Sequence, residues 1–311
     1  MRPRVAITGA TGFIGPHVVR RLRADWQVRI LARRPPDPAL LGAEVEVVRG
    51  QLDDRSLRRL LDGVDAVVHV AGLIKARTRE RFLRANAESV GRMAEIAAAA
   101  SAPPRFVLMS SLAAREPELS DYAASKRAGE QALLAAGGTL RGSILRPPAV
   151  YGPGDPATLS FFRSVRHGIG PLLGPADARL SLIHVEDLAN AVGALLADEQ
   201  GAGLIAEVDD GGGGYTWREM IEAAADAFGR RVRIVRVPMA IPYGLGVLNQ
   251  ALARVPGYVP MLTPGKVREL YHSNWVCDSG PIRARTDWRP AVSLRKGFAA
   301  TIAWYRQQGW L

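Results

Sequence analysis

The stretch Thr8-Gly-Ala-Thr-Gly-Phe-Ile-Gly15 decides the fold of this chain. It follows an apolar run that is typical of a strand and precedes a helical pattern. Its first glycine permits a tight turn, the second lets the backbone approach a pyrophosphate, and the third lets the helix pack close to the strand. The helix N-terminus adds free N–H groups and the positive end of its dipole. The pattern predicts a dinucleotide site, against the alternative of a purely structural turn, with contacts from Gly9, Thr11, Gly12, Phe13, Ile14 and Gly15.

The first half of the chain alternates strand-like and helix-like segments. Short apolar runs predict strands at Val5–Thr8, Val28–Ala32, Val45–Val48, Ala66–Val70, Phe106–Met109 and Ser143–Leu145. Helical patterns cover Ser56–Leu61, Phe82–Ala100 and Tyr122–Ala136. This alternation indicates right-handed βαβ units and a doubly wound parallel sheet of the α/β class, covered on both faces. We expect residues 1–150 to form the nucleotide-binding domain, with 181–208 returning to it through a strand at Leu204–Val208.

From Tyr151 onward, glycines and prolines break the chain into loops and short elements. Residues 151–180 and 209–311 are therefore expected to form a smaller, interleaved substrate-binding lid. Within it, Thr216 and Glu219 have the spacing of a capping box and predict the start of a helix. The apolar stretch Val237–Leu252 has three interpretations: the wall of an apolar pocket, a segment lying against a membrane surface, or an ordinary core helix.

Charge and cysteine content restrict the class of protein. The net charge of +11 comes from dispersed arginines, which argues against nucleic-acid binding and favours phosphorylated small ligands. No apolar stretch reaches the roughly 20 residues of a transmembrane helix. The N-terminal residues lack a signal-peptide pattern, and the single Cys277 excludes an internal disulfide. We expect a cytoplasmic protein, and we assign no residue to a metal site.

Tyr122 and Lys126 form a candidate catalytic pair. Residues four apart lie on one face of a helix, so the phenol and the ammonium would point the same way. A neighbouring ammonium favours the phenolate, which would allow Tyr122 to exchange a proton with a substrate hydroxyl or carbonyl. Taken alone, such a pair is also common on surface helices. Ser111, at the carboxyl end of the fifth strand, is placed to hydrogen-bond the reacting oxygen, whereas Ser110 is expected to be a turn residue.

Several motifs together resemble one family, the extended short-chain dehydrogenases/reductases, also called the NAD-dependent epimerase/dehydratase family. The resemblance covers roughly residues 3–190. The motifs that carry it are Thr8–Gly15, His69-Val-Ala-Gly72, Asn86, Ser110-Ser111, Tyr122-x-x-Ser-Lys126, Arg146-Pro-Pro-x-Val-Tyr-Gly-Pro-Gly154 and His184-Val-x-Asp187. They are specific for a Rossmann-type fold and for the class of cofactor, but not for the substrate.

The resemblance assigns roles to these residues. It implies a catalytic triad of Ser111, Tyr122 and Lys126, with Asn86 on the helix that supports the site. It implies structural positions for His69 and His184, and a capping or supporting role for Asp187. The cofactor contacts that it implies beyond the glycine loop are Val70, Ala71, Gly72, Tyr122, Lys126, Pro147 and Val150.

The end of the second strand bears on the choice of cofactor. Enzymes that select NAD usually place an acid there for the ribose 2′-hydroxyl. This chain has Arg33 and Arg34 instead, and a guanidinium offers a forked contact to a 2′-phosphate. The sequence predicts NADP, with NAD as the alternative. Nearby, Gln51-Leu52 replaces the family's Asp-Leu, and Gln51 can still accept a hydrogen bond from adenine.

Three departures argue against a nucleotide-sugar epimerase or dehydratase. Ser111 and Tyr122 are close in sequence, Leu180 replaces a diphosphate-binding arginine, and the family's later Arg-x-Gly-Asp element is missing. We therefore expect hydride transfer on a carbonyl or secondary alcohol of an apolar small molecule. A nucleotide-sugar epimerase or dehydratase and a non-catalytic NADPH-binding subunit, similar to the complex I accessory protein, remain alternatives. The resemblance also implies a homodimer through the helices that hold Asn86 and Tyr122, where an alanine-rich face at Ala94–Ala100 would allow close packing either there or against the sheet.

Overall fold

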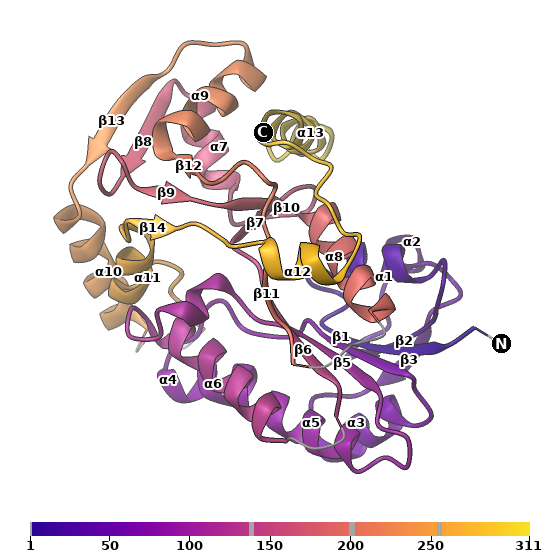
Figure 1. Ribbon diagram of the computed structural model, residues 1–311. Coiled ribbons are helices and arrows are strands. Elements are labelled where there is room, and N and C mark those ends of the chain that lie inside the picture. Colours follow the sequence, from indigo (N-terminus) through magenta and orange to yellow (C-terminus); the bar gives the residue numbers. More distant parts are fainter. Residues whose placement is uncertain (1, 137–139, 199–202, 254, 256) are drawn as a thin grey trace. The chain divides into compact units, whose positions relative to one another are not determined.

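The computed structural model describes residues 2–136, 140–198, 203–253, 255 and 257–311. These residues form two compact units (Figure 1). Unit 1 comprises Met1–Arg146, Ala189–Ala206 and Gly280–Trp288, and unit 2 comprises Pro147–Leu188, Glu207–Ser279 and Arg289–Leu311. The segment 280–288 thus groups with unit 1, although the sequence pattern did not indicate this return. Residues 181–188, which we expected with the nucleotide-binding domain, group with unit 2.

Unit 1 is built on a seven-stranded sheet in the order β11-β6-β5-β4-β1-β2-β3. The strands are β1 (Arg4–Thr8), β2 (Gln27–Ala32), β3 (Glu46–Arg49), β4 (Ala66–His69), β5 (Arg105–Met109), β6 (Gly142–Arg146) and β11 (Ile205–Glu207). The six strands from β6 to β3 pair in parallel. Apart from Val47 on the edge strand β3, their apolar residues are buried on both faces, as a sheet covered by helices on both sides requires. The expected doubly wound α/β fold is confirmed.

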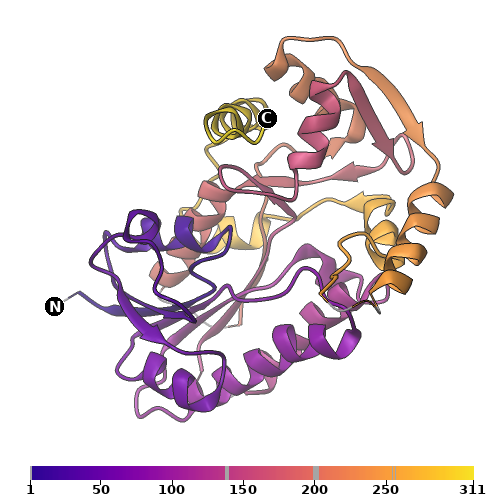
Figure 2. The same ribbon diagram turned by 180° about the vertical axis from the view of Figure 1, so that it is seen from behind.

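Helices cover both faces of this sheet. The helices of unit 1 are α1 (Gly15–Leu22), α2 (Pro38–Leu41), α3 (Asp54–Leu61), α4 (Arg79–Leu83), α5 (Ser89–Ala98), α6 (Asp121–Ala135), α12 (Gly280–Arg285), the larger part of α8 (Val185–Ala197), and the short helices η1 (Arg84–Glu88) and η2 (Leu112–Arg115). In Figures 1 and 2, α3, α5 and α6 lie along one face of the sheet. Their side chains form one core with the strands, including Leu60, Met93, Ala94, Ala97 and Phe106. The alanine-rich face of α5 therefore packs toward the sheet.

Strand β1 lies at the point where the strand order reverses. Thr8 at its end is flanked by Leu31 of β2 on one side and by His69 of β4 on the other. In open parallel sheets, ligands bind outside the carboxyl ends of the strands at such a reversal. The fold therefore brings the glycine loop after β1 next to the residues that follow β4.

The described residues of unit 2 form short strands and six helices or parts of helices. The strands are β7 (Ala149–Tyr151), β8 (Ile169–Leu173), β9 (Arg179–Leu180), β10 (Leu182–His184), β12 (Tyr215–Thr216), β13 (Arg233–Val237) and β14 (Asn274–Trp275). They form three small sheets, which pair β10 with β7, β12 with β9 and β14, and β13 with β8. The helices are α7 (Leu159–Arg166), the first turn of α8, α9 (Trp217–Phe228), α10 (Ala240–Leu252), α11 (Pro264–Leu270) and α13 (Leu294–Gln307).

Aromatic rings form the centre of unit 2. Phe298 of α13 meets the rings of Tyr151 and Phe162 edge to face, with centroids 5.1 and 5.0 Å apart. The predicted capping box is confirmed, since Thr216 and Glu219 exchange the two hydrogen bonds at the start of α9. Within the described residues, none of the helices combines the length and the apolar character that crossing a membrane requires.

Candidate active site

The glycine loop after β1 has the local geometry that its sequence predicts. Gly9 has a φ of +72°, a conformation that residues with a side chain rarely adopt. A Cβ at this position would lie 2.6 Å from the backbone nitrogen of Ala71, so the loop and the segment after β4 touch here. A Cβ at Gly15 would collide with the carbonyl oxygen of Gly9. The first and third glycines thus allow the turn and the close packing of α1 on the strand.

The same loop leaves backbone donors at the start of α1. Gly12 donates its N–H to the carbonyl of Gly9 at 3.1 Å. Among the described residues, none accepts a hydrogen bond from the N–H groups of Thr11, Phe13 or Ile14. These donors lie where the helix dipole favours negative charge. The loop therefore has free backbone donors of the kind that bind the phosphates of a dinucleotide.

A buried histidine holds the segment that follows β4. The Thr8 hydroxyl oxygen lies 2.9 Å from Nδ1 of His69 and accepts the N–H of Ala71 at 3.3 Å. Burial, and secondarily the charge of Lys126, lowers the pKa of His69 to about 3, so the imidazole is neutral at ordinary pH. This arrangement gives His69 a structural position, and it places Val70, Ala71 and Gly72 beside the glycine loop.

Asn86 connects that segment to the helix carrying Tyr122 and Lys126. It lies in η1, a π-helical turn that interrupts the helix expected over 82–100. Its side chain accepts the N–H of Leu73 at 2.7 Å and donates to the Leu73 carbonyl and the Ser125 hydroxyl, both at 2.9 Å. Ser125 in turn donates to the carbonyl of Tyr122 at 2.7 Å. Asn86 therefore fixes the segment that follows β4 to the first turn of α6.

Lys126 is a buried cation at the centre of this group. Its Nζ donates to the carbonyl of Met109, the last residue of β5, at 2.9 Å. A Cβ at Gly72 would lie 3.2 Å from that Nζ and 2.9 Å from Oδ1 of Asn86, so three segments converge here. Burial lowers the pKa of Lys126 to about 8, and the charge of Glu130 opposes this shift.

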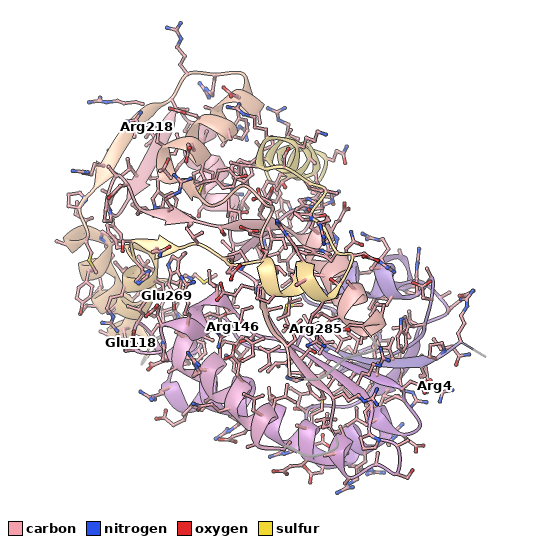
Figure 3. All side chains as sticks on the ribbon, in the orientation of Figure 1. Arg4, Glu118, Arg146, Arg218, Glu269 and Arg285 are labelled. Carbon is pink, nitrogen blue, oxygen red and sulfur yellow. The ribbon has the colours of Figure 1, made fainter. Side chains whose placement is uncertain are left out.

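A second buried charge pair, which the sequence interpretation missed, lies one helical turn further along α6. Glu130 accepts two hydrogen bonds from Arg146, at 2.8 and 2.6 Å, and one from the Ser110 hydroxyl at 2.5 Å. Figure 3 labels Arg146. The spacing of four residues between Lys126 and Glu130 is the one sequence signal that indicates this carboxylate. Through these bonds Glu130 ties the ends of β5 and β6 to α6.

Ser111 and Tyr122 are both half-buried in unit 1. Ser111 begins η2 and accepts the N–H of Ala113 at 3.2 Å. Tyr122 lies in the first turn of α6, and its ring meets that of Phe82 edge to face at 6.1 Å. The residues of the expected catalytic set thus lie at the carboxyl end of β5 and in the elements packed beside it.

The residues expected at the adenosine end follow β2 and β3. The N–H of Gly50 donates to the carbonyl of Ala32 at 3.1 Å. Gln51 and Arg33 come next in the chain after these two hydrogen-bonded residues. Arg33 and Arg34 are exposed and form no ion pair with any described residue. Gln51 is exposed as well, and Leu52 packs partly against the core.

The remaining expected residues lie in unit 2. Pro147 precedes β7 and Val150 lies within it, opposite Ile183 of β10. His184 is buried, which lowers its pKa, and it packs against the ring of Tyr151. Asp187, in the first turn of α8, accepts the N–H groups of residues 291 and 292 at 3.0 and 2.9 Å. Across the described ranges, no group of three His, Cys, Asp or Glu residues is arranged to hold a metal ion.

Comparisons with known proteins show what the chain as a whole is similar to. The model of the NAD dependent epimerase/dehydratase family matches residues 5–205. Ceramide reductase of Caulobacter vibrioides is 45% identical over 99% of this chain and 96% of its own. 2'-Dehydrokanamycin reductase of Streptomyces kanamyceticus is 30% identical over 76% of this chain and 69% of its own. The solved structure of MoeE5 in complex with UDP-glucuronic acid and NAD has a TM-score of 0.75 at 24% identity and covers 98% of this chain and 99% of its own, a likeness in fold.

Proposed function

Because this chain belongs to the NAD-dependent epimerase/dehydratase family, we propose that it reduces a carbonyl group of an apolar, lipid-like substrate with NADPH. That it is an NAD(P)-dependent oxidoreductase follows from the family and from its named reductase relatives. One observation carries the proposed chemistry. Lys126 is buried and bonded to the end of β5, four residues after Tyr122 on the same helix.

The proposed roles follow from the surroundings of each side chain. When bound, the nicotinamide supplies the hydride that reaches the carbonyl carbon. Tyr122 gives its proton to the carbonyl oxygen, so that a secondary alcohol forms. Ser111 donates a hydrogen bond to the same oxygen as negative charge develops there. The ammonium of Lys126 favours the phenolate that Tyr122 becomes, and Asn86 keeps the first turn of α6 in place.

NADP is the proposed cofactor because Arg33 and Arg34 offer exposed guanidinium groups at the end of β2. A charge-assisted contact to phosphate contributes about 1.5–3 kcal/mol. We therefore expect Arg33→Ala to weaken NADPH binding about tenfold or more and to leave NADH binding within a factor of two, as measured by fluorescence titration. Equal affinity of the native chain for NADPH and NADH would contradict the proposed selection of NADP and would mean that the chain uses either cofactor.

The proposed substrate is a ketone of a ceramide-type lipid. The support is the 45% identity to a protein named ceramide reductase over nearly the whole of both chains. A reductase acts on an oxidised form, so the relevant group is a ketone at the position of one of the lipid's hydroxyls. A nucleotide-sugar substrate is the second candidate. Against it, Arg179, which neighbours the expected diphosphate position, donates to the Gly214 carbonyl at 2.6 Å.

The test is an NADPH-oxidation assay with long-chain keto-lipid amides, simple ketones and sugar nucleotides. We expect turnover with the keto-lipid and its loss in Tyr122→Phe, while NADPH binding survives. Phe82→Leu, which changes the ring beside Tyr122, is the control and should keep most of the activity. Undiminished turnover in Tyr122→Phe would contradict the proposed mechanism. Interconversion of sugar nucleotides without net NADPH oxidation would support an epimerase instead.

We also propose a homodimer through the outer surface of α5 and α6. A shallow hollow there is lined by three small residues and three charged ones from η1, α5 and α6, namely Ala87, Glu88, Gly91, Arg92, Glu95 and Ala132. A Cβ at Gly91 would still have ordinary contact with Ala132, whereas an arginine there would fill the hollow. Gly91→Arg should therefore convert a dimer into a monomer in sedimentation velocity. Location in the cytoplasm stays a prediction.

A further inference from the structure

We infer that helix α10 in unit 2 docks on an anionic lipid bilayer through an exposed apolar stripe. The stripe consists of Ile241, Leu245, Leu248 and Leu252, and the 13 residues of the helix include no charged side chain. Spacings of four, three and four residues place these side chains on one face of a helix. Their exposed fractions are 58%, 52%, 57% and 45%. Because these side chains are exposed, α10 is not an ordinary core helix, which was one interpretation of residues 237–252.

The helix is held in place from a different face. Gly246 is the buried residue of α10, and a Cβ there would lie 2.9 Å from the backbone of Thr263. The Asn249 amide donates to the carbonyl of Leu262 at 3.3 Å and accepts from the hydroxyl of Tyr258 at 3.1 Å. These contacts fix α10 against the segment leading into α11, which lies beside it in Figure 1. The stripe points elsewhere, and packing within unit 2 leaves it exposed.

Exposed apolar side chains continue around the stripe. Tyr243, Val247 and Met261 have exposed fractions between 37% and 50%. Isolated apolar residues on a surface are normal, but a contiguous set of this kind marks an interaction site. Within α10 the polar side chains are Tyr243, Asn249 and Gln250, so the charged groups near the stripe come from the flanking segments.

The charge around α10 selects an anionic bilayer as the partner. From residue 227 to residue 268 the chain contains seven lysines and arginines and no aspartate or glutamate. Arg233 and Arg236 are exposed on β13, directly before α10. Basic residues next to an apolar helix face are attracted to anionic headgroups. A 13-residue helix is about 20 Å long, too short to cross the hydrocarbon core, so α10 would lie in the plane of the interface.

The docking inference does not depend on the proposed reductase activity. Each can fail without the other, because the assay for docking needs neither cofactor nor substrate. The full chain is mixed with phosphatidylcholine vesicles, with or without phosphatidylglycerol, and the bound fraction is measured by flotation at low and high salt. We expect binding to the vesicles that contain phosphatidylglycerol, weakened by salt.

Two variants test the two parts of the surface. Leu245→Gln/Leu248→Gln should lower the partition coefficient about tenfold or more, because two apolar side chains no longer enter the membrane. The matched control Leu40→Gln/Leu134→Gln changes leucines of similar exposure in unit 1 and should stay within about twofold. Arg233→Glu/Arg236→Glu should weaken binding only to anionic vesicles, whereas Arg55→Glu/Arg58→Glu on α3 should have a much smaller effect.

Three outcomes would overturn the inference. The first is that the native chain does not bind vesicles. The second is that the leucine control loses as much vesicle binding as the stripe variant. The third is that the native chain binds no vesicles but forms a dimer in solution, which the stripe variant abolishes. The last outcome would assign the stripe to a second copy of the chain. Circular dichroism checks that each variant is folded, and Leu245→Ala/Leu248→Ala, a milder change, should weaken vesicle binding in the same direction.

Discussion

The carboxyl edge of the sheet in unit 1 and the stripe on α10 in unit 2 are organised in opposite ways. At the sheet edge, Asn86, Lys126 and Glu130 are buried, and each polar group is bonded to a neighbour. The stripe is apolar and exposed, and its helix is held by few polar contacts. Buried polar groups are stable only when bonded, so a change at the edge is costly. A change in the stripe costs the fold little, which suits a surface that meets an external partner.

The largest expected effect concerns Glu130. Glu130→Gln leaves Arg146 as a buried cation without its carboxylate, and loss of one partner of such a pair destabilises by about 3–5 kcal/mol. Urea denaturation should show this as a lower free energy of unfolding. In Glu130→Gln/Arg146→Met the buried cation is removed as well, so we expect a smaller loss than in the single variant. Equal losses would mean that the pair contributes nothing beyond its packing.

The same substitution also tests whether Glu130 positions Lys126, the cation of the proposed mechanism. Its charge opposes the lowering of the Lys126 pKa, so the variant should hold Lys126 at a pKa below 8. The pH at which kcat/KM falls on the alkaline side should then move to lower pH. A purely structural role would lower the yield of folded enzyme and leave the pH profile unchanged.

The second prediction concerns stability between pH 8 and 10.5. The pKa of Lys126 is about 8 in the fold against an ordinary value of 10.5, so the unfolded chain binds more protons in this range. The Lys126 contribution to the free energy of unfolding should therefore rise as pH increases from 8 to 10.5, by about 3 kcal/mol in total. The difference between the native chain and Lys126→Met, measured by urea denaturation across this range, isolates it. A constant difference would show that Lys126 is not desolvated.

The third prediction concerns Asn86. Asn86→Ala removes three hydrogen bonds and leaves the N–H and carbonyl of Leu73 without their partner, at a cost of about 1–3 kcal/mol. Because the same side chain bonds Ser125 and so the first turn of α6, we expect kcat to fall more than the affinity for NADPH. Ser89→Ala, which removes only the bond from the Ser89 hydroxyl to the carbonyl of Ala85 in η1, is the matched control and should leave kcat nearly unchanged. Loss of NADPH affinity alone would restrict Asn86 to the cofactor loop.

The sequence allowed much of unit 1 to be predicted because its signals are local. The glycine loop, the alternation of strands and helices, and the pair Tyr122 and Lys126 each depend on residues within a few positions of one another. Contacts between distant segments could not be predicted in this way. The bonds from Glu130 to Arg146 and Ser110 require the sheet to place β5, β6 and α6 together.

The elements outside the regular βαβ pattern were harder to anticipate for a related reason. The π-helical turn at 84–88 has no distinctive composition, and the return of segment 280–288 to unit 1 depends on tertiary contacts. The sequence of residues 237–252 is compatible with a buried helix and with an exposed one. Apolar spacing shows which residues share a face of a helix, but not what covers that face.

The smallest expected effect sharpens the contrast between the two regions. Leu248→Gln replaces a side chain that is 57% exposed, so the free energy of unfolding in the absence of lipid should change by less than about 0.5 kcal/mol. Leu60→Gln on α3 is the matched buried change and should cost several times more, since it places an amide in the core. Thermal denaturation of both variants, with and without anionic vesicles, measures this. If α10 docks on lipid, vesicles should stabilise the native chain and Leu60→Gln more than Leu248→Gln. A large loss of stability in Leu248→Gln without lipid would mean that the stripe is covered within the folded protein.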